Sequence, residues 1–220
     1  MRIEAVSLTV ADVEVSADFY EHVLGLPVAR DGGAARVTIG TSILELRGDP
    51  AHVGPHHLAI TIPSNKFDES KAWISARVEL LTADGADEFE TAPSWNAHSL
   101  YFMSPDGTIL EFIIRRDLDN STTGPFTSSH LLNVSEVGIA VDDVSRTLRE
   151  LAEHGIEAYG WNADDFAPVG DIDGLLILVR AGRPWFPTAL AARVSAIGVD
   201  ARGAAPAEIP LAPSSNLKLR

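Results

Sequence analysis

Apolar and polar residues along the chain follow one pattern that occurs three times. An alternating apolar strand runs into a polar turn, and the apolar spacing then changes from every second residue to the three- and four-residue spacing of a helix. The three stretches begin at Ala5 (AVSLTVADVEVSADFYEHVLGLPV), His57 (HLAITIPSNKFDESKAWISARVELL) and Glu136 (EVGIAVDDVSRTLRELAEHGIEAY). The predicted N-caps of the three helices are Asp12, Ser64 and Asp143.

Strand-rich sequence follows each predicted helix. The stretch HSLYFMSPDGTILEFII is predicted to be a hairpin that turns at Asp106-Gly107, and GDIDGLLILV repeats this turn at Asp173-Gly174. In the first copy, ARVTIGTSILELR is a similar hairpin that turns at Gly40. Each copy is therefore predicted to be a βαβββ module, and the fold class to be α+β.

The repeat divides the chain into segments. Residues 1–52 form the first module, 53–116 the second, and 131–190 a third, partial module. Residues 117–130 (DLDNSTTGPFTSSH) are polar and contain Gly and Pro, which is typical of a linker. Residues 191–220 are a C-terminal extension, in which the Ala/Pro-rich stretch 202–216 is predicted to be extended coil after one strand near 193–199.

Composition excludes several classes of function. The 220 residues carry 17 Lys and Arg against 31 Asp and Glu, a formal charge of −14, so a nucleic-acid partner is not expected. The absence of cysteine excludes disulfides, thiolate nucleophiles and cysteine-based zinc sites. No membrane association is expected either, because apolar runs such as LLILV at 175–179 are too short to span a bilayer. The expected localisation is cytoplasmic.

Three phrases carry a resemblance to a known superfamily. The second module opens with His57 in HLAITIP and closes with SPDGTILEF, while ADVEVSADFYEHVLGL stands at the first predicted helix. Together they resemble the vicinal oxygen chelate superfamily of glyoxalases, bleomycin- and fosfomycin-resistance proteins and extradiol dioxygenases. The resemblance implies that two modules pair into a curved, cup-shaped mixed sheet with helices outside, around one divalent metal. It implies that the first two modules here form one such domain.

The resemblance also implies a ligand set, taken from the first and last strand of each module. These positions fall on His57 and Glu111 in the second module, and on Ala5 and Glu45 in the first. Ala5 cannot bind metal, so His57, Glu111 and Glu45 are the predicted ligands, and His56 is predicted to face away from the cup. One imidazole and two carboxylates suit Mn, Fe or Zn.

The third module has the opposite pattern. Glu136 stands at its first-strand position and Leu178 at its last. Glu136 is interpreted as a solvent-facing strand residue, with a role as ligand in an unusual pairing as the alternative.

Several of these residues have ordinary structural interpretations as well. Glu45 lies two residues from Arg47, and a surface ion pair would account for both. His98 and Tyr101 are candidate catalytic or substrate-contacting residues together with Glu111, although only one of the two can face the cup, and Tyr101 could simply be a half-buried sheet residue. The aromatic loops SWN at 94–96 and RPWFPT at 183–188 are interpreted as small satellite cores rather than pocket walls.

The favoured hypothesis is a small-molecule enzyme that uses a divalent metal to chelate vicinal substrate oxygens, with isomerase, lyase or oxygenase chemistry. Ring cleavage is not expected, because ring-cleaving members of the superfamily use two histidines and Ala5 replaces one. The alternative is a metal-free, ligand-sequestering protein of the bleomycin-resistance type. A lone third module would leave a half-cup with a free sheet edge, which predicts a homodimer.

Overall fold

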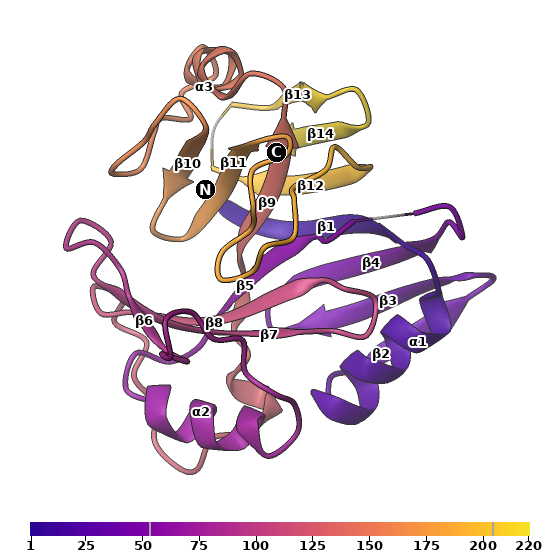
Figure 1. The fold of residues 1–220 in the computed structure, drawn as a ribbon, viewed down its shortest axis with the longest axis vertical. Helices are drawn as coiled ribbons and strands as arrows, with labels where there is room; N and C mark the ends of the chain where they lie inside the picture. The colour runs from indigo at the N-terminus through magenta and orange to yellow at the C-terminus, as the bar shows by residue number, and fades with distance from the viewer. Residues whose placement is uncertain (53, 204) are drawn as a thin grey trace.

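Two seven-stranded mixed sheets make up most of the molecule (Figure 1). The computed structural model describes residues 1–52, 54–203 and 205–220. The predicted start of the second module at residue 53, and residue 204 within the predicted coil, lie outside the described residues.

The first sheet has the order β13-β14-β12-β1-β4-β3-β2. Its strands are β1 (Arg2–Val10), β2 (Val28–Asp31), β3 (Ala34–Ile39), β4 (Ser42–Gly48), β12 (Ile197–Arg202), β13 (Ala207–Ala212) and β14 (Ser215–Leu219).

The second sheet has the order β10-β11-β9-β5-β8-β7-β6. Its strands are β5 (His57–Thr61), β6 (Phe89–Glu90), β7 (Ala97–Met103), β8 (Ile109–Arg115), β9 (Asn133–Val141), β10 (Phe166–Asp171) and β11 (Gly174–Arg180).

The repeated module is confirmed, with a helix after the first strand of each of the three predicted copies. The helices are α1 (Val13–Asp18), which continues as the π-helical η1 (Phe19–Val23), α2 (Phe67–Ser75) and α3 (Val144–Ala152), and a 3₁₀ turn, η2 (Ser128–His130), ends the predicted linker. The side chains of Asp12 and Asp143 cap α1 and α3 as predicted. Ser64 does not cap α2, which begins after Lys66, and its hydroxyl instead contacts that of Ser121.

The C-terminal extension is a fourth module, with three strands and no helix in its described residues, and the prediction of extended coil is wrong. Strand β12 pairs in parallel with β14, as the first strand of every other module pairs with its last. The prolines masked this pattern, but Pro210 lies on β13, the edge strand of the sheet, where a missing N–H does no harm.

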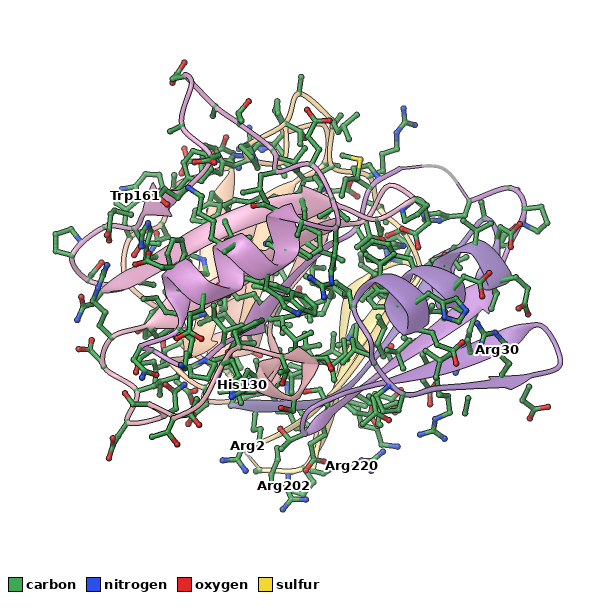
Figure 2. All side chains as sticks on the ribbon, turned by 90° about the horizontal axis from the view of Figure 1, so that it is seen from below. Arg2, Arg30, His130, Trp161, Arg202 and Arg220 are labelled. Carbon is green, nitrogen blue, oxygen red and sulfur yellow. The ribbon has the colours of Figure 1, made fainter. Side chains whose placement is uncertain are left out.

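The modules also pair differently from the prediction. Strand β1 pairs antiparallel with β12, and β5 pairs antiparallel with β9, so the first module shares a sheet with the fourth and the second with the third. The pairing brings Arg2 beside Arg202, with Arg220 close by at the surface (Figure 2). Because every module finds its partner within the chain, no half-cup is left that a homodimer would have to complete.

Each sheet has a concave face and a face that is packed in the apolar core. On β8, Leu110 and Phe112 are buried on the side of α2, where the ring of Trp73 lies 6.4 Å from that of Phe112. Glu111 points to the opposite face, as alternation requires. Among the described helices, none is long and apolar enough to cross a membrane.

Candidate metal and ligand site

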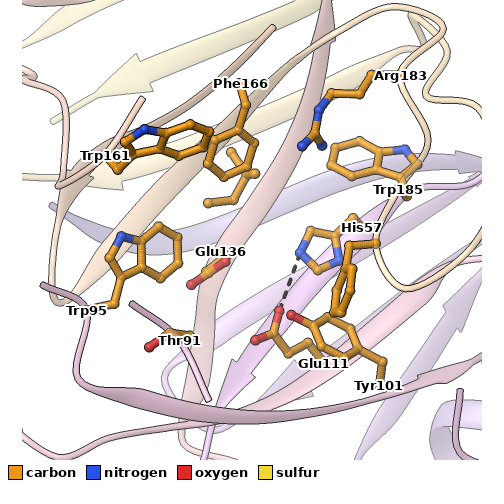
Figure 3. Close-up of a pocket in the computed structure, with 12 residues that line it drawn as sticks. His57, Thr91, Trp95, Tyr101, Glu111, Glu136, Trp161, Phe166, Arg183 and Trp185 are labelled. Carbon is orange, nitrogen blue, oxygen red and sulfur yellow. Dashed lines mark ion pairs between the residues drawn. The ribbon is translucent and has the colours of Figure 1, made fainter. Parts of the chain in front are cut away.

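Three ionisable side chains meet on the concave face of the second sheet. Strand β5 lies between β8 and β9, and Ala59 is in register with both Glu111 and Glu136. His57, two residues before Ala59, points to the same face. The ligand atoms of His57, Glu111 and Glu136 all lie within 4.8 Å of one another, and all three residues are buried (Figure 3).

His57 is held as a neutral imidazole. Its Nε2 is 3.6 Å from a carboxylate oxygen of Glu111, and burial lowers the pKa of His57 to about 4. Room for the ring comes from Gly138 on β9, where an added Cβ would lie 2.9 Å from the Cβ of His57 and 2.5 Å from the ring of Trp185. Among the described residues, the buried Nδ1 of His57 has no hydrogen-bond partner that meets normal geometry.

His56 points away from this cluster. Its Nε2 is 2.7 Å from the carbonyl oxygen of Thr9 on β1, and its ring stacks on His52. Burial lowers the pKa of His56 to about 4 as well, so both adjacent histidines are neutral near pH 7. Only His57 lines the pocket.

The two carboxylates are close, buried and only partly compensated. Burial, together with the nearby charge of Glu136, raises the pKa of Glu111 to about 8. Burial also raises the pKa of Glu136, against the effect of Arg115, whose guanidinium is 2.5 Å from a carboxylate oxygen of Glu136. With both carboxylates ionised, the site would hold one negative charge more than Arg115 neutralises, which is costly in a buried site. The raised pKa of Glu111 means that a proton removes this charge below about pH 8 in the metal-free protein.

The donor set fits a divalent cation. A neutral imidazole and two carboxylates are ligands for Mn, Fe or Zn, and a divalent cation would take the place of the proton that Glu111 otherwise holds.

Glu45 is not brought to this cluster, and Glu136 stands in the place that was predicted for it. Glu45 lies on β4 in the first sheet, where it forms ion pairs with Arg47 at 3.3 Å and Arg36 at 3.6 Å. The prediction failed because it paired the first two modules. The interpretation of Glu136 as solvent-facing is wrong for the same reason, since β9 is covered once it pairs with β5.

The two remaining candidates, Tyr101 and His98, lie on opposite faces of β7. Tyr101 is in register with Glu111 and lines the pocket, where burial raises the pKa of its hydroxyl well above the usual range. His98 points to the opposite face of β7 and stacks on Phe67 of α2, with 3.7 Å between ring centroids. On β11, Ile177 rather than Leu178 lines the pocket.

Arg115 was missed by sequence reasoning. It is the last residue of β8, four residues after Glu111 and on the same face, and it is fully buried. A charged residue at the end of an apolar strand is ordinarily exposed. Its burial follows from the pairing of β9 with β5, which was not predicted.

A pocket of about 300 Å³ lies above the cluster. Its walls are aromatic. Trp95 and Trp185, from the SWN and RPWFPT loops, pack in small apolar clusters as predicted and also line the pocket. The lining residues are His57, Thr91, Trp95, Tyr101, Glu111, Glu136, Trp161, Phe166, Ile177, Arg183, Trp185 and Phe186 (Figure 3).

Comparisons with known proteins agree with this architecture. The sequence profile of the Glyoxalase/Bleomycin resistance protein/Dioxygenase superfamily matches residues 2–174. A proposed dioxygenase from Bacillus subtilis subsp. subtilis str. 168 superposes with a TM-score of 0.63 at 18% identity, covering 92% of this chain and 70% of its own. A V278E mutant of glyoxalase I from Zea mays superposes with a TM-score of 0.57 at 15% identity, covering 99% and 91%. At these identities the likeness shows the fold alone. A search of curated proteins gives no match.

Proposed function

The chain belongs to the Glyoxalase/Bleomycin resistance protein/Dioxygenase superfamily, and from this premise we propose that it is a metal-dependent enzyme acting on a small molecule. His57, Glu111 and Glu136 would hold a divalent cation, Mn, Fe or Zn, at the floor of the aromatic pocket. The observation that carries the proposal is the convergence of three buried ligand groups within 4.8 Å of one another, two of them carboxylates with raised pKa values.

The metal, when bound, would act as a Lewis acid toward two neighbouring oxygens of the substrate. The chain itself contributes a neutral imidazole at His57, because burial keeps the pKa of that ring at about 4. Arg115 holds the carboxylate of Glu136 in place through a buried ion pair. Tyr101 stays protonated near pH 7 and presents its hydroxyl to the pocket as a hydrogen-bond donor. The aromatic walls exclude water from the reacting end of the ligand.

Calorimetric titration of Mn²⁺ tests the metal site. We expect stoichiometric binding to the wild-type protein and at least a 100-fold loss of affinity in His57→Ala and in Glu111→Gln, because a three-ligand site that loses one ligand chelates poorly. Glu45→Gln is the matched control, since it neutralises a carboxylate on the equivalent strand of the other sheet. Equal affinities in wild type and His57→Ala would rule the assignment out.

A second candidate is a metal-free protein that sequesters a small ligand, as bleomycin-resistance members of the superfamily do. The observation in its favour is the ion pair between Arg115 and Glu136, which already neutralises one of the two carboxylates. Under this function, chelator treatment would leave ligand binding unchanged and the purified protein would contain no stoichiometric metal. Measuring the metal content of the purified protein therefore distinguishes the two functions.

A further inference from the structure

Aromatic rings from distant parts of the chain surround the pocket above the three ligand groups. Trp95 precedes β7, Trp161 and Phe166 lie before and at the start of β10, and Trp185 and Phe186 follow β11. The chain has 4 tryptophans, and three of them line this pocket, the exception being Trp73 on α2. Trp185 and Trp95 also pack in a small apolar cluster around Ile177, whereas Trp161 is exposed.

The rings present their faces in two groups. Trp161 and Phe166 lie nearly parallel, 28° apart with 5.9 Å between centroids, and Trp161 is 62% exposed at the edge of the molecule (Figure 2). Across the opening lie Trp185 and Tyr101, which flank His57, with Glu136 visible between the two groups (Figure 3). One face of Trp161 stacks on Phe166, and the exposure of the ring leaves its other face open to a ligand.

The charged residues at the opening limit how much negative charge the ligand can carry. Among the described lining residues, Arg183 alone has a full positive charge, and its Nε is already 3.3 Å from a carboxylate oxygen of Asp165. Phosphate groups are normally held by several cationic or backbone N–H donors. A single, partly neutralised guanidinium over the ring of Phe166 does not fit a ligand with several phosphates.

We propose that the pocket takes a planar aromatic ligand of one or two rings, uncharged or with a single acidic group, whose faces stack between the two groups of rings. A volume of about 300 Å³ fits a molecule of this size. The inference rests on the proposed function for the chelating end of the ligand. Recognition of the aromatic body depends on the walls alone and can be measured without metal.

The experiment compares 2-naphthol with decahydro-2-naphthol, which has a similar size and the same hydroxyl but no aromatic faces. Both are titrated by calorimetry into chelator-treated protein. We expect at least tenfold tighter binding of 2-naphthol, because stacked aromatic pairs add to the burial of apolar area. Trp161→Ala should weaken binding of 2-naphthol five- to tenfold, and Trp161→Phe should retain most of it. Leu190→Ala, which removes another exposed apolar side chain (42% exposed) outside the lining, should change nothing.

Equal affinity for the two naphthols would overturn the inference, and so would an effect of Trp161→Ala no larger than that of Leu190→Ala. The proposed function fails separately. If Mn²⁺ does not bind but 2-naphthol binds as expected, the aromatic site stands without the metal. If Mn²⁺ binds and the naphthols do not differ, the metal site stands and the aromatic ligand is excluded.

Discussion

The concave faces of the two sheets are built on the same strand arrangement but carry different side chains. In the second sheet Ala59 is in register with Glu111 and Glu136, and in the first sheet Ser7 is in register with Glu45 and Gly198 in the same way. The residues two positions earlier are His57 and Ala5. The first sheet therefore has one of the three ligand groups where the second has all three.

The surroundings differ as well. The concave face of the first sheet has a cavity of about 310 Å³ that is lined mainly by small and polar residues, without the aromatic walls of the second. Glu45 is partly exposed there and is neutralised by Arg36 and Arg47. Glu111 has neither solvent nor a direct cationic partner among its described contacts. Ligand chemistry thus depends on a few positions and their burial, since the backbone arrangement is shared.

The largest difference between the two sheets should appear when the arginine paired with a carboxylate is replaced, Arg115 in the second sheet and Arg47 in the first. Arg115→Met leaves Glu136 buried without its partner, and we expect the protein to lose about 3 kcal/mol of unfolding free energy. Arg47→Met breaks a solvent-exposed pair in the first sheet and should cost about 0.5 kcal/mol or less. Urea denaturation of both variants measures the contrast. The double variant Arg115→Met/Glu136→Gln should recover much of the loss, and a loss that persists would mean that packing, not charge, is responsible.

The next effect is the pH dependence of the metal-free protein. The pKa of Glu111 is raised to about 8 in the folded state, so the folded state binds more protons than the unfolded state and stability falls as pH rises toward 8. The lowered pKa values of His56 and His57 act oppositely, raising stability as pH rises from about 4 to the ordinary histidine range near 6.5. Between pH 6.5 and 8 the raised pKa values of the two carboxylates lower stability, and the half-buried N-terminal amine, whose pKa is lowered by burial, opposes them in part.

We therefore expect the unfolding free energy of the metal-free protein to fall by about 2 kcal/mol between pH 6.5 and 8, at about 1.36 kcal/mol per pH unit. Thermal or urea unfolding at the two pH values measures it. Glu111→Gln should remove the loss and be more stable than wild type at pH 8, whereas Glu45→Gln should keep it. A loss of the same size in Glu111→Gln would show that another group titrates.

The smallest expected effect is weak metal binding by a variant of the first sheet. The triple variant Ala5→His, Ser7→Ala, Gly198→Glu would reproduce the residues of the second sheet around Glu45. Ser7 must shrink, because a Cβ at position 198 would lie 2.8 Å from its hydroxyl. We expect weak Mn²⁺ binding, because the site stays open to solvent and Arg47 competes for Glu45. It is measured by calorimetry in a Glu111→Gln background, where no binding at all would show that burial is required as well.

The sequence alone determined the repeat unit and half of the site. The change of apolar spacing from two to three or four located three strand-helix units, and the Asp106-Gly107 turn set the hairpin that carries Glu111. Alternation then sent His57 and His56 to opposite faces, and placed only one of His98 and Tyr101 in the pocket. These features depend on residues close in sequence, so their physical causes are local.

Only the tertiary structure decided which modules share a sheet. Any first strand offers the same unpaired backbone edge, so local pattern cannot distinguish β9 from β1 as the neighbour of β5. That choice brought Glu136 to the site instead of Glu45 and buried Arg115 beside it. It also joined the loops of Trp95, Trp161 and Trp185 into one pocket wall, because contacts between distant segments follow from sheet order and not from the spacing of residues within each strand.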